Sequence, residues 1–354
     1  MFQLFIKPID LTSQVPNFIQ DSANFDGINY LHIAKYGYGL YQQAFFPLFP
    51  LLIKLVSFVT NNNYFIAGLI ISNLSFLIGI VVFKKYLGSI SKNPSKITWI
   101  LLFLLAFPTS FFFGAVYTES LFFLLFVSAL YFTQEKRYWL VIACCILASM
   151  TRLMGVFLLI PVLFTVINQK KHIHFTDWKI ILAILSPGLG LLTYMLYLTY
   201  TVGNPLAFYS TQSNFNAGRT TGSLITLPQV YFRYLNIFIS AQHNLVYFVA
   251  VLEFLIFNLV FAVLLYNLWI LWKRKDVLNR ISLIGLNLFS LINILLPTLT
   301  GTFSSVPRYA LLSLSFFIQL AEINNKLVKS VILILFTILL IILLGCFTQG
   351  YFVS

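Results

Sequence analysis

Charged residues are scarce in this sequence. Asp, Glu, Lys and Arg together fill 9% of its 354 positions, and only nine residues are acidic. Soluble domains carry about 25% charged residues, so the composition excludes a soluble enzyme and a charge-rich disordered chain. Cysteine is nearly absent as well: there are three, and two of them, Cys144 and Cys145, are adjacent. Adjacent cysteines rarely bridge and no CxxC spacing occurs, so neither a disulfide scaffold nor a zinc site is supported.

Nucleotide-binding and hydrolase signatures are also missing. The chain has no Walker A motif, no GxGxxG fingerprint and no GxSxG elbow, so this chain is not expected to use nucleotide energy directly. Of the four histidines, His172 and His174 form an HxH pair in a basic segment, where a solvated pair is the simpler interpretation. We therefore predict no cofactor and no metal site; a divalent metal is compatible with the sequence but not indicated by it.

Hydrophobic residues, in contrast, occupy 60% of the positions, and 38 of these are phenylalanine. They form long runs, and about 20 residues are needed for a helix to cross the hydrocarbon of a bilayer. The sequence therefore predicts an all-α polytopic membrane protein with about ten transmembrane helices, a count that short runs leave open by one or two. The runs lie near residues 64–83, 97–114, 117–133, 138–150, 156–167, 180–200, 245–272, 281–300, 309–321 and 330–346.

The charges that do occur are mostly basic, with a net charge of +13. In a soluble protein this surplus would suggest nucleic acid, but in a membrane protein basic residues collect in short cytoplasmic loops. We therefore predict membrane lipids and no nucleic acid as partners. Most basic residues fall in alternate loops, which we assign to the cytoplasm: Lys84, Lys85, Lys92, Lys96, Lys136, Arg137, Lys170, Lys171, Lys179, Lys273, Arg274, Lys275, Arg280, Lys326 and Lys329.

The opposite, outer side receives the N-terminal segment and one long loop. Pro47 and Pro50 interrupt the apolar stretch 44–60, which favours an interfacial or re-entrant segment over a straight spanning helix. The whole chain, 1–354, is treated as one membrane-embedded domain. Its parts are an outer acidic loop and interfacial segment (1–60), a first set of helices (64–200), a long outer loop (201–243) and a second set of helices (244–348).

Four ionisable residues lie at the predicted outer face: Asp26, Glu119, Arg152 and Arg308. Such residues are costly at membrane depth and usually functional. Three of them also have a simpler interpretation. Asp26 precedes Gly27 in a turn-type dipeptide, Glu119 suits a helix N-terminus or an arginine partner, and Arg152 could snorkel to lipid phosphate. Arg308 could bind a phosphate through its planar guanidinium, and the four together predict a functional site.

Short motifs also follow one another in a characteristic order over residues 25–310. They are Phe25-Asp26-Gly27, Tyr30, Ile33-Ala34, Gly37-Tyr38, AFFPLFP at 44–50, YTESLF at 117–122, Thr151-Arg152 with Gly155, GNPLAF at 203–208 with Gln212, and Pro307-Arg308-Tyr309. This order resembles the phosphatidylinositol glycan class V mannosyltransferases, although Phe25 stands where that family usually has tryptophan.

The resemblance implies a GT-C type glycosyltransferase fold with outer-face loops. It further implies transfer of a hexose, mannose in that family, from a polyprenyl (dolichyl-type) phosphate sugar to a glycolipid or surface-glycan acceptor. Eukaryotic members act in glycosylphosphatidylinositol-anchor biosynthesis. Such a donor is already activated, which agrees with the missing nucleotide motifs. The protein would reside in the plasma membrane of a bacterium or the endoplasmic reticulum of a eukaryote.

Displacement at the anomeric carbon needs a base for the acceptor hydroxyl and stabilisation of the departing phosphate. We predict Asp26 as the base, because it matches the acidic position of the family loop. No second carboxylate is clearly paired with it in the sequence, which favours a single inverting displacement. Two arginines are predicted to bind phosphate, and the sugar would be held mainly by Glu119, Asn204 and Gln212. The full set of predicted substrate-binding residues is Glu119, Arg152, Arg308, Tyr309, Asn204 and Gln212.

Three other interpretations stay open. A transporter or flippase of lipid-linked sugars would also place charges in a membrane cavity, but nearer the midplane and beside paired helix breaks. A related GT-C enzyme could move another sugar, or polymerise or ligate a surface glycan. A non-catalytic membrane scaffold is the third alternative, because fold-level analogy does not settle chemistry.

Overall fold

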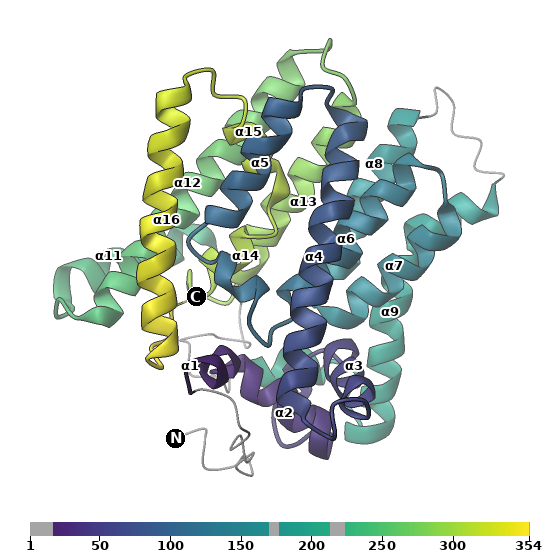
Figure 1. Ribbon diagram of the computed structural model, residues 1–354, viewed down its shortest axis with the longest axis vertical. Helices are drawn as coiled ribbons and strands as arrows, with labels where there is room; N and C mark the ends of the chain where they lie inside the picture. Colours follow the sequence, from purple (N-terminus) through teal and green to yellow (C-terminus); the bar gives the residue numbers. More distant parts are fainter. Residues whose placement is uncertain (1–16, 170–176, 213–223, 354) are drawn as a thin grey trace.

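The computed structural model describes residues 17–169, 177–212 and 224–353, and within these ranges the only regular secondary structure is helical. Figure 1 shows a bundle of long helices with the short N-terminal helices gathered at one end. The all-helical prediction is therefore confirmed for the described part of the chain. His172 and His174 lie outside the described residues.

Five of the described helices are long and apolar enough to cross a membrane. Their flanks carry many exposed leucine, isoleucine and valine side chains, above all on the last of them. Such surfaces are stable in hydrocarbon rather than in water, so the chain is a membrane protein. The five are α4 (Tyr64–Ile90), α9 (Trp178–Val202), α12 (Leu245–Lys273), α13 (Arg280–Thr298) and α16 (Lys326–Thr348).

The other five predicted runs are also helical, but their helices are shorter than a bilayer requires. The run near 309–321 is divided between two short helices, and the run near 97–114 stops at Ala106. Proline disfavours helical backbone in the residue before it, and Phe107 before Pro108 is accordingly extended, with ψ 140°. The shorter helices are α5 (Pro94–Ala106), α6 (Glu119–Gln134), α7 (Tyr138–Thr151), η5 (Leu153–Leu158) leading into α8 (Leu159–Gln169), α14 (Val306–Ala310) and α15 (Leu314–Leu320).

Most of the long helices begin at a side chain that caps them. The oxygen of Asn63, Asn244 or Asn325 accepts a hydrogen bond from a backbone N–H in the first turn of α4, α12 or α16. Asp177 does the same for α9. Since the first four N–H groups of a helix have no partner within it, these residues explain where the helices start.

The N-terminal segment forms short helices and not a crossing. Pro47 precedes α3 and Pro50 lies in its first turn, where proline is tolerated. The helix ends at Ser57 after only ten residues, in agreement with the predicted non-spanning segment. Figure 1 places α1, α2 and α3 together, at the end of the bundle away from the α4–α5, α12–α13 and α15–α16 turns. The short elements are α1 (Asn17–Gln20), η2 (Asp21–Ala23), α2 (Asp26–Tyr36), η3 (Gln42–Ala44) and α3 (Leu48–Ser57).

The long loop predicted at 201–243 contains two helices. α10 (Ala207–Ser210) is a single turn, whereas α11 (Leu227–Ser240) is fourteen residues long. Figure 1 shows α11 extending sideways from the bundle, across the direction of α16. The long loop is therefore partly helical over its described residues.

Candidate active site

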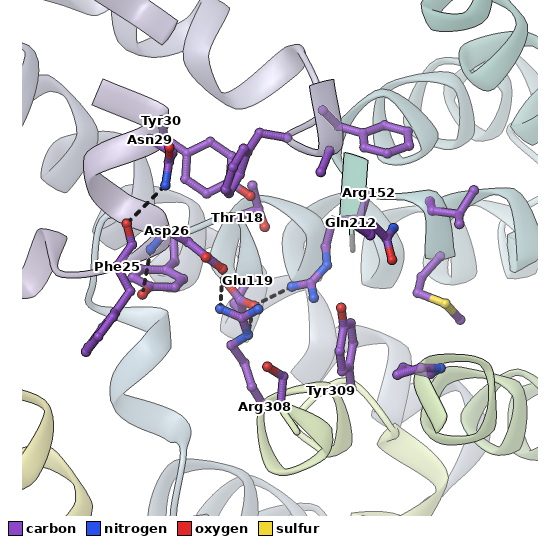
Figure 2. Close-up of a pocket in the computed structure, with 18 of the residues that line it drawn as sticks. Phe25, Asp26, Asn29, Tyr30, Thr118, Glu119, Arg152, Gln212, Arg308 and Tyr309 are labelled. Atoms are coloured by element: carbon purple, nitrogen blue, oxygen red, sulfur yellow. Dashed lines mark hydrogen bonds and ion pairs between the residues drawn. The ribbon is translucent and has the colours of Figure 1, made fainter. Parts of the chain in front are cut away.

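The four ionisable residues singled out in the sequence meet in one buried cluster (Figure 2). Arg308 is at its centre: its Nη1 lies 2.6 Å from Oδ2 of Asp26, and its Nε lies 3.4 Å from Oε1 of Glu119. Arg152 pairs with the same Oε1 of Glu119. The cluster joins the starts of α2 and α6, the end of α7 and the short helix α14. With two acids and two arginines, it is formally neutral.

The two carboxylates differ in how deeply they are buried. The side chain of Glu119 is 1% exposed, whereas that of Asp26 is 28% exposed. A buried charge is tolerated when it is paired, and Glu119 has both arginines as partners. Asp26 is therefore the carboxylate that a ligand can reach, and Glu119 is the acid around which the two arginines are arranged.

The simpler interpretations of these residues can now be judged. Asp26 opens helix α2 and is not part of a free turn. Glu119 is the first residue of α6 and also pairs with an arginine, so both of its expected roles hold. The snorkelling interpretation of Arg152 is wrong, because its buried guanidinium lies against Glu119 and does not extend to the lipid surface.

Aromatic rings enclose both guanidinium groups. Arg308 lies 5.4 Å from the ring centre of Tyr117 and 5.5 Å from that of Phe112, and Arg152 lies 5.0 Å from that of Tyr309. A cation over an aromatic face is attracted to it, more strongly where water is excluded. The rings therefore fix the planes of the two guanidinium groups.

Their surroundings keep Arg308 charged and Tyr117 neutral. Burial by itself acts to lower the pKa of Arg308, but the negative charges of Asp26 and Glu119 raise this pKa well above its usual value. Burial raises the pKa of Tyr117 well above its usual value, and the charge of Asp26 adds to the effect. The protonated Tyr117 hydroxyl donates to the Asn24 carbonyl at 2.7 Å. It thereby holds the backbone just before Asp26.

Two of the helices that carry the cluster, α2 and α14, each follow a residue with a strained backbone. Phe25, directly before α2, has φ 58°, and Ser305, directly before α14, has φ 65°. Residues other than glycine rarely adopt this left-handed region, at a cost of about 1–3 kcal/mol each, and such residues cluster at functional sites. The ring of Phe25 packs edge-on against Phe352 at 5.3 Å. This packing helps to hold the unusual conformation that aims Asp26.

Arg308 is also held through the carbonyls on either side of it. Thr109 Oγ1 donates to the Pro307 carbonyl at 2.8 Å, and Asn293 Nδ2 donates to the Tyr309 carbonyl at 2.6 Å. The five residues of α14 are too few to pair all of its carbonyls internally. Sequence analysis missed Thr109 and Asn293; the only available signal was a polar residue inside an apolar run.

A glycine sets the position of Arg152. A Cβ atom on Gly155 would lie 2.4 Å from the backbone carbon of Ala148, in the last turn of α7. Only glycine allows the chain to fold back this closely after Arg152, because backbone atoms cannot move aside as a flexible side chain can. Gly155 thus lets η5 pack against the end of α7 and fixes the turn that carries Arg152.

The cluster lines a cavity of about 670 Å³, within the usual range for small-molecule sites. Six of the seven predicted site residues line it, and Figure 2 shows Asp26 on one side of Arg308 and Gln212 near Arg152. Asn204 does not: it is exposed, and its Oδ1 accepts from the backbone N–H of Leu206 at 2.9 Å. Polar lining residues that were not predicted as site residues are Asn24, Asn29, Tyr30, Thr118, Thr151, Tyr209, Thr300 and Ser305. Of these, Tyr30, Thr118 and Thr151 belong to the motifs found in the sequence.

The cavity wall is not uniform. Asn24, Asn29 and Tyr30 are grouped with Asp26 along the chain, whereas apolar Leu153 and Met154 directly follow Arg152. Further apolar lining residues are Phe46, Leu224, Leu296 and Leu299. A polar ligand group and an apolar chain can therefore be accommodated together. Among the described residues, no group of three or more His, Cys, Asp or Glu side chains could hold a metal ion.

The described helices include five that are long enough to cross a bilayer, and a charged cluster lines a cavity among the helices, so the chain is a membrane protein with a candidate ligand site. The family model "Mannosyltransferase (PIG-V)" matches residues 4–222, more than half of the chain, and the chain belongs to this family. This match confirms the resemblance inferred from the motifs. No curated protein matches the chain. The matched region contains Asp26, Glu119 and Arg152, whereas Arg308 lies beyond it.

Proposed function

We propose that the protein transfers a hexose, mannose by family, from a polyprenyl-phosphate sugar to a hydroxyl of a glycolipid or surface glycan at the outer or lumenal face of the membrane. The observation that carries this proposal is the Asp26–Arg308–Glu119–Arg152 cluster, because it supplies a reachable carboxylate and two fixed guanidinium groups beside one cavity. These are the groups that displacement of a phosphate from an anomeric carbon requires.

The guanidinium groups suit the departing phosphate. Arginine presents several N–H donors in a plane, which matches two phosphate oxygens at once. The apolar residues Leu153 and Met154 beside Arg152 would accommodate the first part of the prenyl chain. We therefore place the lipid phosphate at Arg152 and Arg308, with the sugar toward Asp26.

The ion pairs already present in the cluster determine which carboxylate an incoming phosphate would displace. Arg308 already holds Asp26 at 2.6 Å, so an incoming phosphate competes with that carboxylate for the same guanidinium. Glu119 cannot be displaced as easily, because it is enclosed and shared by both arginines. Phosphate binding would therefore release Asp26, which is then available to the acceptor.

The transfer step follows from these positions. The acceptor oxygen forms a bond to the anomeric carbon, the bond from that carbon to the phosphate oxygen breaks, and the electron pair leaves with the phosphate. The hydroxyl proton passes to the carboxylate of Asp26. Since Glu119 is pinned by two arginines and 1% exposed, it is poorly placed as a nucleophile, which favours a single inverting displacement.

Sugar hydroxyls would meet the remaining polar wall. Glu119 also lines the cavity, but its side chain is 1% exposed and its Oε2 is buried. It would therefore act on the donor through the two arginines that it holds in place. Gln212, Asn29 and Thr118 line the same cavity and supply further donors and acceptors.

The test is sugar transfer by the full-length protein in proteoliposomes, with radiolabelled polyprenyl-phosphate mannose and membrane glycolipid extracts as acceptors. Asp26→Asn should lower transfer by about 10²- to 10⁴-fold, the usual contribution of a positioned base. Asp21→Asn is the matched control, because Asp21 lies outside the cavity wall. Equal transfer by both variants would refute the role of Asp26. A folded protein that binds the lipid and moves it across the bilayer without sugar transfer would instead favour the flippase.

A further inference from the structure

Helix α11 has three distinct faces along its length. Val230 and Tyr234 are buried against the rest of the protein. Phe232, Leu235 and Ile239 are 57%, 51% and 84% exposed, and their spacing of three and four residues places them in one stripe. A second exposed stripe is polar and consists of Gln229, Asn236 and Ser240. On the helical wheel, the apolar stripe lies beside this polar stripe and away from the buried face.

The described surroundings of α11 leave the apolar stripe without a protein partner. The single charged residue of the helix, Arg233, is directed elsewhere, because its Nη1 donates to the Gly301 carbonyl at 3.1 Å. The spanning helix α12, against which α11 packs, also exposes apolar side chains: Val246 is 76% and Leu255 is 59% exposed. Since this flank of α12 faces hydrocarbon, the apolar stripe belongs to a helix that packs directly on a lipid-covered one.

We propose that α11 is an interfacial helix whose apolar stripe is inserted in the outer boundary between headgroups and acyl chains, with its polar stripe turned to the headgroups and water. Amphipathic helices of this kind lie in the plane of the interface with the apolar face about 5–10 Å deep. Figure 1 agrees with this orientation, because α11 runs across the direction of α16. The partner is the lipid surface itself.

The anchored helix also holds one wall of the cavity. Tyr234 Oη donates to Glu253 of α12 at 2.6 Å and accepts from the backbone N–H of Phe303 at 3.1 Å. With the Arg233 contact to Gly301, this fixes the segment 299–303, in which Leu299 and Thr300 line the cavity. α11 would thus keep that wall, and Arg308 shortly after it, at the depth where lipid headgroups lie.

Photocrosslinking tests this position without requiring activity, so its failure and that of the proposed function are distinguishable. p-Benzoylphenylalanine replaces Phe232, Leu235 or Ile239 in the full chain, reconstituted in vesicles of tritiated phosphatidylcholine. Matched variants carry the probe on the polar stripe, at Gln229, Asn236 or Ser240.

The expected result is tritium crosslinked to the three apolar-stripe variants and markedly less to the three polar-stripe variants. Equal labelling of both stripes, or no labelling of the apolar stripe while α16 position Ile341, 65% exposed, is labelled, would overturn the proposal. A crosslinked dimer at Phe232, Leu235 or Ile239 would overturn it as well, because a second copy of the chain would then cover the stripe.

Discussion

Removing the charge of Asp26 should strengthen phosphate binding while it strongly slows transfer. In the resting cluster Asp26 occupies Nη1 of Arg308 at 2.6 Å, and the proposed donor phosphate competes for the same group. Asp26→Asn keeps the shape and one acceptor oxygen of the side chain but removes its negative charge. Arg308 is then left with less competition for an incoming anion.

The size of the effect follows from the geometry. A hydrogen bond to a charged group contributes about 1.5–3 kcal/mol, and screening reduces this value here because the Asp26 side chain is 28% exposed. A net gain of about 1–2 kcal/mol in phosphate binding corresponds to a Kd lower by about 5- to 30-fold. An ordinary substrate-binding residue would give the opposite sign.

The assay is calorimetric titration of a short-chain polyprenyl phosphate into wild type, Asp26→Asn and the control Asp21→Asn in the same detergent. Wild type and the control should bind alike, and Asp26→Asn more tightly. Weaker or unchanged binding by Asp26→Asn would refute the competition between Asp26 and phosphate for Arg308, whether or not the enzyme transfers mannose.

Three further changes have defined outcomes. Glu119→Gln leaves two buried arginines without their shared acid, and should lower the free energy of unfolding by about 3–5 kcal/mol, seen as a lower Tm. Thr109→Val removes the donor to the Pro307 carbonyl and should lower kcat more than it raises KM, whereas Thr109→Ser should restore kcat. Gly155→Ala places a methyl group 2.4 Å from the backbone of Ala148 and should cost about 1–3 kcal/mol of stability, also measured as a lower Tm.

Controls separate these effects from general damage. Glu135 is an exposed acid at the other end of α6, and Glu135→Gln should leave Tm unchanged. If Glu119→Gln is equally harmless, the two arginines do not depend on that carboxylate. If Thr109→Val matches wild type in kcat, or Gly155→Ala matches it in Tm, the corresponding contact does not constrain its arginine.

The ten apolar runs were predictable because hydrophobic runs specify helices locally, and each of them is helical in the structure. The number of crossings was less predictable, since five described helices meet the required length and composition. The run near 309–321 illustrates the reason. Its two short helices are stabilised by Asn293, which pairs with the Tyr309 carbonyl and the Ser313 hydroxyl across space. Nothing in the sequence of the run itself predicts that contact.

The candidate site, too, was only partly predictable from the sequence. Scarcity of charge, position at the predicted outer face and the family motifs together singled out Asp26, Glu119, Arg152 and Arg308, because a membrane protein rarely places ionisable residues near hydrocarbon without a use for them. Asn204 was selected from a family motif, but its side chain caps a turn at the surface instead of lining the cavity. The polar residues that line the cavity without charge, such as Asn29, carried no comparable signal.

The sequence by itself determined that this protein is helical, resides in a membrane and belongs to the mannosyltransferase (PIG-V) family, because composition, run length and motif order are local properties of the chain. Only the tertiary structure decided which charges are partners. Asp26 and Arg308 are 282 positions apart in the chain, and both arginines share one oxygen of Glu119. Such pairings depend on how separate helices pack, since charges excluded from water must find their partners wherever the fold brings them.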